Sequence, residues 1–290
     1  MSTNQALIRR KALFDWLGIA PFMLFAILFL VAPTLYLVTG AFFNTQGDVT
    51  FSNITGLFTD KILASYMMSI KISFASAIGG GLIGSVLAWA VVMGGVPPWI
   101  RSSMLTFSGV ASNFAGVPLA FAFLATVGRT GVVTILLRDL FGFNLYASGF
   151  NLISFSGLTL TYMYFQIPLM ILILTPALDG MKKEWREAAE ILGASSFQYW
   201  TRVALPILWP SLLGTALLLF ANAFGAVATA VALTGSTLNI VPIQLFAQMR
   251  GDVLHNVNLG YAMALGMIVI TGVSNIGYIL LRIRAERWQK

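Results

Sequence analysis

The chain has 290 residues, of which 58% are hydrophobic and only 9% are charged. Because soluble globular domains carry about 25% charged residues, this composition excludes a soluble protein and indicates an integral membrane protein. The net charge of +7 comes from Lys and Arg that lie mostly between apolar segments, where they set membrane orientation. The charge therefore gives no reason to expect nucleic acid as a partner. Cysteine is absent, so the redox compartment is left undefined.

Six apolar segments predict six transmembrane helices, because each is long enough for the ~20 residues that cross a bilayer. Membrane β-strands would span about ten residues and alternate apolar with polar positions. These segments are longer and apolar throughout, so a barrel is excluded. We therefore expect an all-α integral membrane protein with a single transmembrane domain over residues 1–290. The approximate helix limits are 16–42, 66–94, 104–127, 154–178, 207–234 and 258–282.

Lys and Arg are unevenly divided between the two sides that six helices define. Short loops rich in these residues stay in the cytoplasm, so the richer side is expected to be cytoplasmic. That side consists of the N-terminus 1–15, the 95–103 loop, the 179–206 loop and the tail 283–290, and together with Arg282 at the end of the sixth helix it carries twelve of the 17 basic residues. The predicted topology has both termini inside.

The second predicted helix contains Gly79-Gly80-Gly81-Leu82-Ile83-Gly84, a literal match to the dinucleotide-binding pattern G-x-G-x-x-G. No strand is predicted before it, and the next acidic residue is Asp139, so the pattern lacks its structural context. Glycines inside a membrane helix allow helix backbones to approach closely. We expect helix packing to be their purpose.

The third and fourth predicted helices carry polar residues that are candidates to line a path through the membrane. Ser112 and Asn113 lie in the third helix, and Tyr162, Tyr164 and Gln166 lie in the fourth. The alternative interpretation is hydrogen bonding between helices or simple packing. The sequence alone leaves both interpretations open for each residue.

The charged 179–206 loop between the fourth and fifth helices predicts two short helices. Asp179 is expected to cap the first, and Gly193 to end it in the left-handed conformation. Ser195 and Gln198 have the spacing of a capping box for the second. Pro206 is expected to open the fifth membrane helix, preceded by a residue that proline pushes out of the helical region.

The first of these short helices is predicted to be amphipathic. Its apolar face consists of Trp185, Ala188, Ala189 and Leu192, and its acidic stripe of Glu184, Glu187 and Glu190. A solvated connecting loop is the alternative interpretation. An exposed apolar face in such a loop usually has a partner, so we expect a compact knob that binds another protein.

The same loop contains Glu187-Ala188-Ala189, three residues, Gly193, nine residues and then Val203-Ala204-Leu205-Pro206. This spacing resembles the EAA loop of permease subunits of binding-protein-dependent ABC importers, whose pattern is E-A-A-x3-G-x9-I-x-L-P. Val203 in place of Ile is the one departure. The six-helix layout, with this loop between helices four and five, extends the resemblance over most of the chain.

The resemblance implies a type I importer fold in which the knob is a coupling helix seated in a groove of a separate ATPase. Carried over by position, Glu187 would make polar contact with the ATPase, and Ala188 and Ala189 would permit close approach. Gly193 would form the bend, and Leu205-Pro206 would join the knob to the fifth helix.

The fifth predicted helix contains the strongest path candidate, Asn222-Ala-Phe-Gly225, in which Asn222 would face a cavity and Phe224 would act as a gate; Thr229 is a further candidate. The region from Phe220 to Gln244 resembles the spermidine/putrescine branch of these permeases, which is grouped with ferric iron, thiamine and phosphonate transporters. The membrane helices offer no carboxylate to a polyamine. Specificity would then belong to an external binding protein.

The expected function is therefore ATP-driven import of a small polar solute, such as a polyamine, across a bacterial inner membrane. The implied partners are a second permease subunit, two ATPase subunits that hold ATP and Mg²⁺, a substrate-binding protein and membrane lipid. The binding protein would dock on the loops 128–153 and 235–257, which contain Asp139 and Asp252.

No catalytic residue, cofactor or metal site is expected in this chain itself. His255 is the only histidine, no thiol is present, and no glycine precedes a lysine as a phosphate-binding loop requires. The alternatives are an ion-coupled carrier or channel that needs no ATPase, and a membrane scaffold that moves no solute. Coupled carriers usually place ionisable groups inside their helices, and here only Lys71, near a helix end, is of that kind.

Overall fold

The computed structural model describes residues 18–250 and 256–286. In this part of the chain the regular structure is helical apart from one isolated bridge between Phe43 and Val49. Six helical segments are long and apolar enough to cross a membrane, which is the predicted number, but the third lies at 116–141 and not at the predicted 104–127. They are Gly18–Gly40, Asp60–Met93, Gly116–Phe141, Phe155–Asp179, Ser196–Phe224 and Val257–Ala285. The predictions for residues 1–15, Asp252 and His255 lie outside the described residues.

The contacts divide the chain into two units, the first made of residues 1–59 and 248–266. Its helix Gly18–Gly40 includes a π-helical turn, η1 (Ile27–Val31), before α2 (Ala32–Gly40), which has a proline in its first turn. The ring of Tyr36 packs edge-on against that of Tyr261 at the start of α14 (Val257–Glu286). A short helix, α3 (Ser52–Gly56), follows a loop that is closed by hydrogen bonds from the Asn53 amide to the carbonyls of Ala41 and Phe43.

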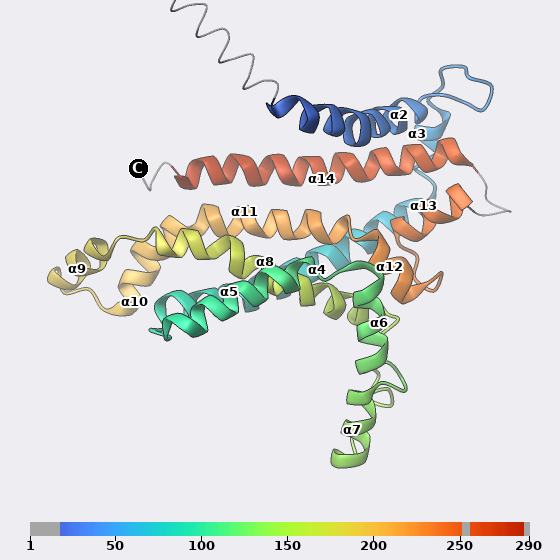
Figure 1. The fold of residues 1–290 in the computed structure, drawn as a ribbon. Helices are drawn as coiled ribbons and strands as arrows, with labels where there is room; N and C mark the ends of the chain where they lie inside the picture. The colour runs from blue at the N-terminus through green and yellow to red at the C-terminus, as the bar shows by residue number, and fades with distance from the viewer. Residues whose placement is uncertain (1–17, 251–255, 287–290) are drawn as a thin grey trace, which may run out of the picture. The chain divides into compact units, whose positions relative to one another are not determined.

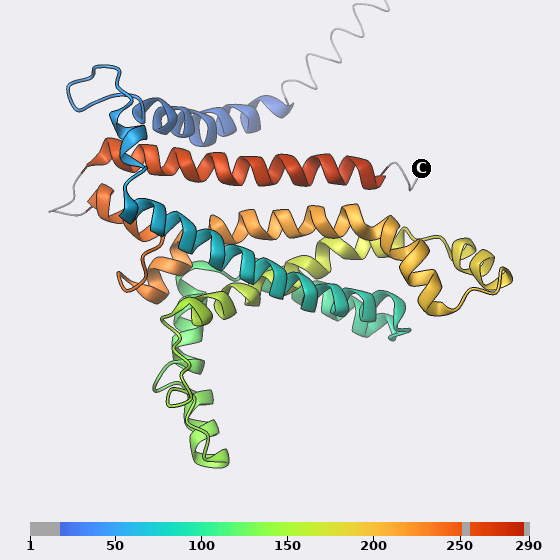
Figure 2. The same ribbon diagram turned by 180° about the vertical axis from the view of Figure 1, so that it is seen from behind.

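The second unit is made of residues 60–247 and 267–290. Three long helices run side by side in it, α4 (Asp60–Met93), α8 (Phe155–Asp179) and α11 (Leu205–Phe224), and α5 (Pro98–Asn113) packs against α8 (Figure 1). At one end of α8 and α11 lie α9 (Lys183–Ile191), α10 (Ser196–Tyr199) and the π-helical turn η2 (Trp200–Ala204) (Figure 2).

The opposite end of this unit is built from shorter helices. They are α6 (Gly116–Val127), α7 (Val132–Phe141), α12 (Val227–Thr234) and α13 (Val241–Arg250). In both views α6 and α12 lie at the end of α11 that is remote from α9. The unit therefore places α9 and α12 at opposite ends of the same long helix, α11.

The glycine run of α4 lies in close contact with α8. A Cβ added to Gly84 would lie 2.6 Å from Cβ of Met170 and 2.7 Å from the carbonyl oxygen of Ile167, both on α8. Only glycine fits at such a distance, so the prediction that this run serves helix packing is confirmed. The same interface buries a hydrogen bond from Nε2 of Gln166 to Oγ of Ser76, at 3.0 Å.

Candidate functional site

We call residues 183–204 the knob, because α9, α10 and η2 fold there into a compact helical unit. α9 ends at Gly193, whose φ of +76° lies in the left-handed region. The N–H of Gly193 donates to the carbonyl of Glu190, and the N–H of Ala194 to that of Ala189, both at 2.9 Å. This is the Schellman arrangement that glycine favours at helix ends, so the predicted bend at Gly193 is confirmed.

The second arm of the knob continues into the membrane helix without a break. Ser195 and Gln198 form the predicted capping box through two reciprocal hydrogen bonds. The prediction that the helix is interrupted before Pro206 is wrong, because Leu205 is helical at φ −61° and ψ −45°, and its N–H donates to the carbonyl of Trp200. The wider π turn accommodates the proline. Residues 196–224 thus form one continuous helix of 29 residues.

The knob has a small apolar interior that fixes the angle between its arms. Ala189, Tyr199 and Ala204 are buried, and Trp185 and Trp200 pack against them. Trp200 also makes an edge-to-face contact with Trp89 of α4, at 6.1 Å between ring centroids, so the knob is anchored to the membrane helices.

Two predictions about the knob need correction. Ala188 and Ala189 do not share one outer face, because Ala188 is exposed and Ala189 is buried inside the knob. Asp179 does not cap α9, whose N-cap is Lys182 without a side-chain hydrogen bond. Asp179 is instead the last residue of α8 and forms an ion pair with Arg101, because the chain turns through Gly180 before α9 begins.

The outer surface of the knob is both apolar and acidic. Ile191 and Leu192 are each 86% exposed, and Phe197 is 76% exposed. Glu187 is exposed beside them, and Glu190 is paired with Arg186 at 3.0 Å. Apolar side chains with this exposure on a folded unit are typical of a protein-binding surface.

The other end of the second unit contains two helix breaks that the sequence did not predict. The first lies between α5 and α6, where Phe114 and Ala115 leave the helical region and Gly116 adopts φ +74°. The backbone N–H of Gly116 donates to the Oγ1 of Thr229 at 2.7 Å. Thr229 is buried in α12, so a side chain from another helix supports this break.

The second break lies between α11 and α12. Ala226, at φ −78° and ψ 59°, makes an inverse γ-turn in which the N–H of Val227 donates to the carbonyl of Gly225 at 2.8 Å. The hydroxyl of Tyr162, on α8, donates to the carbonyl of Ala226 at 3.0 Å. Each break is therefore held by a specific side chain from elsewhere in the fold.

The two breaks meet at a cavity of about 480 Å³. Its lining residues are Ser112, Asn113, Ala115, Gly116, Phe165, Asn222, Gly225, Ala226, Val227, Ala228 and Thr229. Non-helical backbone at membrane depth is tolerated only where it is buried in protein or borders a water-filled space. The first turns of α6 and α12 also present N–H groups that have no acceptor within their own helices.

Four of the predicted path residues line this cavity, and the others do not. Those that line it are Ser112, Asn113, Asn222 and Thr229. Tyr162 supports the second break from outside the lining, and Gln166 is fully buried between α4 and α8. Phe224 is buried and stacks on Phe220. Tyr164 packs edge-on against Phe114 and Phe123.

Sequence reasoning missed Gly116, Ala226 and the pairing of the two breaks. Gly116 carries a local signal, because a glycine two residues before Pro118 inside an apolar helix is an unusual combination. Ala226 carries none, since Ala is the best helix former. Its break depends on Tyr162, which is 64 residues away in the chain.

Comparison with known proteins supports a permease. Residues 80–288 match the family model described as binding-protein-dependent transport system inner membrane component. The chain is 29% identical to the "Probable sulfate transport system permease protein cysT" of Chlorella vulgaris over 176 residues, which are 58% of this chain and 60% of that protein. It is 26% identical to the "Putative 2-aminoethylphosphonate transport system permease protein PhnU" of Salmonella typhimurium over 94% of this chain and 92% of that protein.

The fold is also that of a known importer. A chain of a bacterial ABC transporter involved in the import of the acidic polysaccharide alginate superposes with a TM-score of 0.68, at 17% identity, over 98% of this chain and 99% of that one. The predicted type I permease fold is therefore confirmed, as is its place in an inner membrane. The chain belongs to the family of binding-protein-dependent transport system inner membrane components.

Proposed function

We propose that this chain forms the solute path of an ATP-driven importer and is moved by a separate ATPase that binds the knob. The observation that carries the proposal is the continuous helix over residues 196–224, which begins in the knob and reaches Asn222 on the cavity wall. A displacement at the knob passes along this helix without a flexible joint. The helix ends at the break beside Gly225, where a change in tilt alters the shape of the cavity.

The knob provides a surface of the right chemistry for the ATPase. Glu187 offers a carboxylate, and Ile191, Leu192 and Phe197 offer apolar area, on a unit that the Gly193 bend and the capping box keep rigid. The distribution of Lys and Arg along the sequence leads us to expect the knob on the cytoplasmic side of the membrane. The transmitted motion would switch the cavity between inward and outward access, as alternating access requires.

We further propose that the solute is a small oxyanion rather than a polyamine. The described lining residues of the cavity include no carboxylate, whereas two helix amino-termini border it. Helix amino-termini favour anions through their N–H groups and partial positive charge. Relatives named as sulfate and 2-aminoethylphosphonate permeases agree with an anion. The predicted spermidine/putrescine assignment remains a prediction that these observations do not support.

The remaining partners complete the proposal. A substrate-binding protein would deliver the solute at the side opposite the knob, where the segment 128–153 is not the predicted loop throughout but contains α7, with Asp139 paired with Arg138 at 2.9 Å near its end. A second permease chain would complete the path.

The test is uptake of sulfate, a phosphonate and spermidine into vesicles that contain the permease complex, its ATPase and its binding protein. ATP-dependent uptake of an oxyanion, abolished by Glu187→Lys without loss of membrane insertion, is the expected result. Uptake that persists with a catalytically inactive ATPase would instead establish an ion-coupled carrier or channel. Uptake of spermidine alone would overturn the oxyanion proposal and leave the ATP-driven mechanism in place. An assembled complex that moves none of the three would favour the scaffold.

A further inference from the structure

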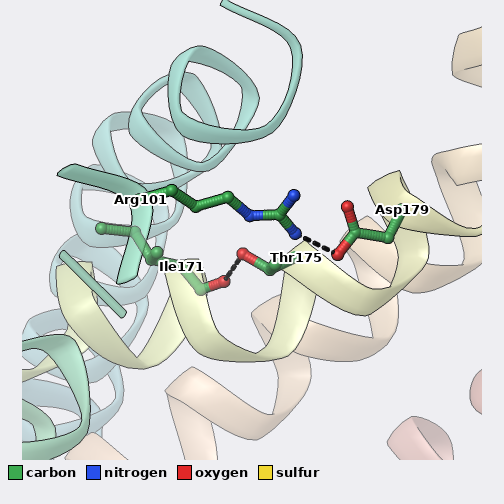
Figure 3. A network of polar contacts seen from close by, with 4 residues as sticks. All are labelled: Arg101, Ile171, Thr175 and Asp179. Atoms are coloured by element: carbon green, nitrogen blue, oxygen red, sulfur yellow. Dashed lines mark hydrogen bonds and ion pairs between the residues drawn. The ribbon is translucent and has the colours of Figure 1, made fainter. Parts of the chain in front are cut away.

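Arg101 and Asp179 form an ion pair where the first arm of the knob leaves the membrane helices. Nη2 of Arg101 lies 2.5 Å from Oδ2 of Asp179, and 78 residues separate the two in the chain. Arg101 is the fourth residue of α5, and Asp179 is the last residue of α8. Figure 3 shows the Arg101 side chain extending along the final turns of α8 to reach the carboxylate.

Neither charge is favourable for the helix that carries it. A helix has partial positive charge at its amino-terminus and partial negative charge at its carboxyl-terminus. Arg101 lies at the amino-terminal end of α5, and Asp179 at the carboxyl-terminal end of α8. Local helix stability therefore does not explain either residue. The favourable interaction of each comes from the other, so the pair serves the link between the two helices.

The pair also spans a weak turn of α8. Pro176 lies inside α8, three residues before Asp179, and has no N–H to complete the backbone hydrogen bond of that turn. On the same face, Oγ1 of Thr175 donates to the carbonyl of Ile171 at 2.6 Å (Figure 3). The end of α8 beyond the proline is thus held to α5 by the ion pair.

The two arms of the knob are attached differently. The second arm is continuous with α11 through η2. The first arm is joined to α8 only through residues 180–182, which are not helical. Force applied to the knob would therefore reach α11 directly. It would reach α8 through the non-helical residues 180–182 only if the end of α8 is held in place.

We propose that Arg101 and Asp179 form a positioning latch that fixes the root of the knob, so that motion of the ATPase enters α8 and α5 as well as α11. The inference rests on the proposed function, because it concerns how the knob transmits force. The latch predicts that its loss changes the number of ATP molecules hydrolysed for each solute imported, and not merely the amount of complex.

The experiment compares this ratio in reconstituted complexes that carry wild-type chain, Arg101→Gln, Asp179→Asn, or the exchanged pair Arg101→Asp with Asp179→Arg. Both single variants are expected to raise the ratio several-fold. The exchanged pair, which restores the attraction, is expected to return it toward the wild-type value. The matched control is Arg284→Gln, which removes an exposed arginine from the last turn of α14 and should leave the ratio unchanged.

Two further results decide the proposal. Because Arg101 and Asp179 are 37% and 42% exposed, raising the salt concentration should increase the ratio in the wild type more than in the single variants. Should the single variants fail to assemble with the ATPase, recovery of assembly by the exchanged pair supports the latch and its failure overturns it. ATP-driven import with wild-type ratios in both single variants overturns the latch alone. Import by the wild type without ATP overturns the proposed function itself.

Discussion

The hydroxyl oxygen of Thr229 accepts a hydrogen bond from the backbone N–H of Gly116 at 2.7 Å, across 113 residues of chain. This single bond joins the broken third helix to the broken fifth. The N–H of Gly116 is the kind of group that a helix start leaves without an internal acceptor. The two breaks are therefore one structural unit, and the cavity between them depends on both.

Replacing Thr229 with Val tests this relationship, because Val keeps the shape of the side chain and removes the acceptor. A partly buried N–H would then lose its partner, at a cost of about 1–3 kcal/mol. We expect a lower unfolding temperature in detergent and reduced uptake. Thr229→Ser keeps the hydroxyl and is the control. Equal unfolding temperatures for the Val variant and the wild type would show that the bond does not hold the breaks together.

Replacing Gly193 with Val tests the bend of the knob. Gly193 has φ +76°, a conformation that a β-branched residue adopts only with strain, so α9 should no longer end in its Schellman turn. We expect weaker ATPase binding, measured by co-purification, while the chain still inserts into the membrane.

Gly47→Val is the matched control for this substitution. Gly47 also has positive φ, at +90°, and lies in an exposed turn outside the knob. It should impose similar backbone strain without affecting the ATPase. Loss of ATPase binding in both variants would attribute the effect to general instability.

Replacing Gly84 with Ala tests the contact between α4 and α8. The added Cβ would meet Met170 and the carbonyl of Ile167 at distances no Cβ tolerates, and overpacking of this kind costs about 1–3 kcal/mol. We expect a clear fall in the unfolding temperature. Gly272→Ala, which places its Cβ in open space on α14, should show no fall. Similar unfolding temperatures for the two variants would contradict the tight packing at Gly84.

The absence of cysteine allows single cysteines to report which side chains face the cavity. Asn222→Cys and Asn113→Cys should react with a water-soluble thiol reagent, and transported solute should slow the reaction, because both residues line the cavity. Gln166→Cys should remain unlabelled, since Gln166 is fully buried between helices. Rapid, solute-sensitive labelling at Gln166 would instead place that position on the path.

Much of the fold could be predicted because its determinants are local. Apolar length fixes a membrane helix wherever it lies in the protein. The bend at Gly193 and the capping box at Ser195 depend on residues at most five positions apart. The same is not true of Gln166 and Asn222, two amides in apolar helices that the sequence could not distinguish. Only packing shows that one joins helices and the other lines a cavity.

The sequence by itself thus determined the membrane class, the number of membrane spans and the position of the knob, since hydropathy and capping act within a few turns of chain. Only the tertiary structure decided where the helices break, because the backbone groups freed at Gly116 and Ala226 are satisfied by Thr229 and Tyr162 from other helices. It also decided that Asp179 pairs with Arg101 and does not cap α9. Hydrogen bonds and ion pairs between distant segments have no periodicity in the sequence, so they exist only once the helices have packed.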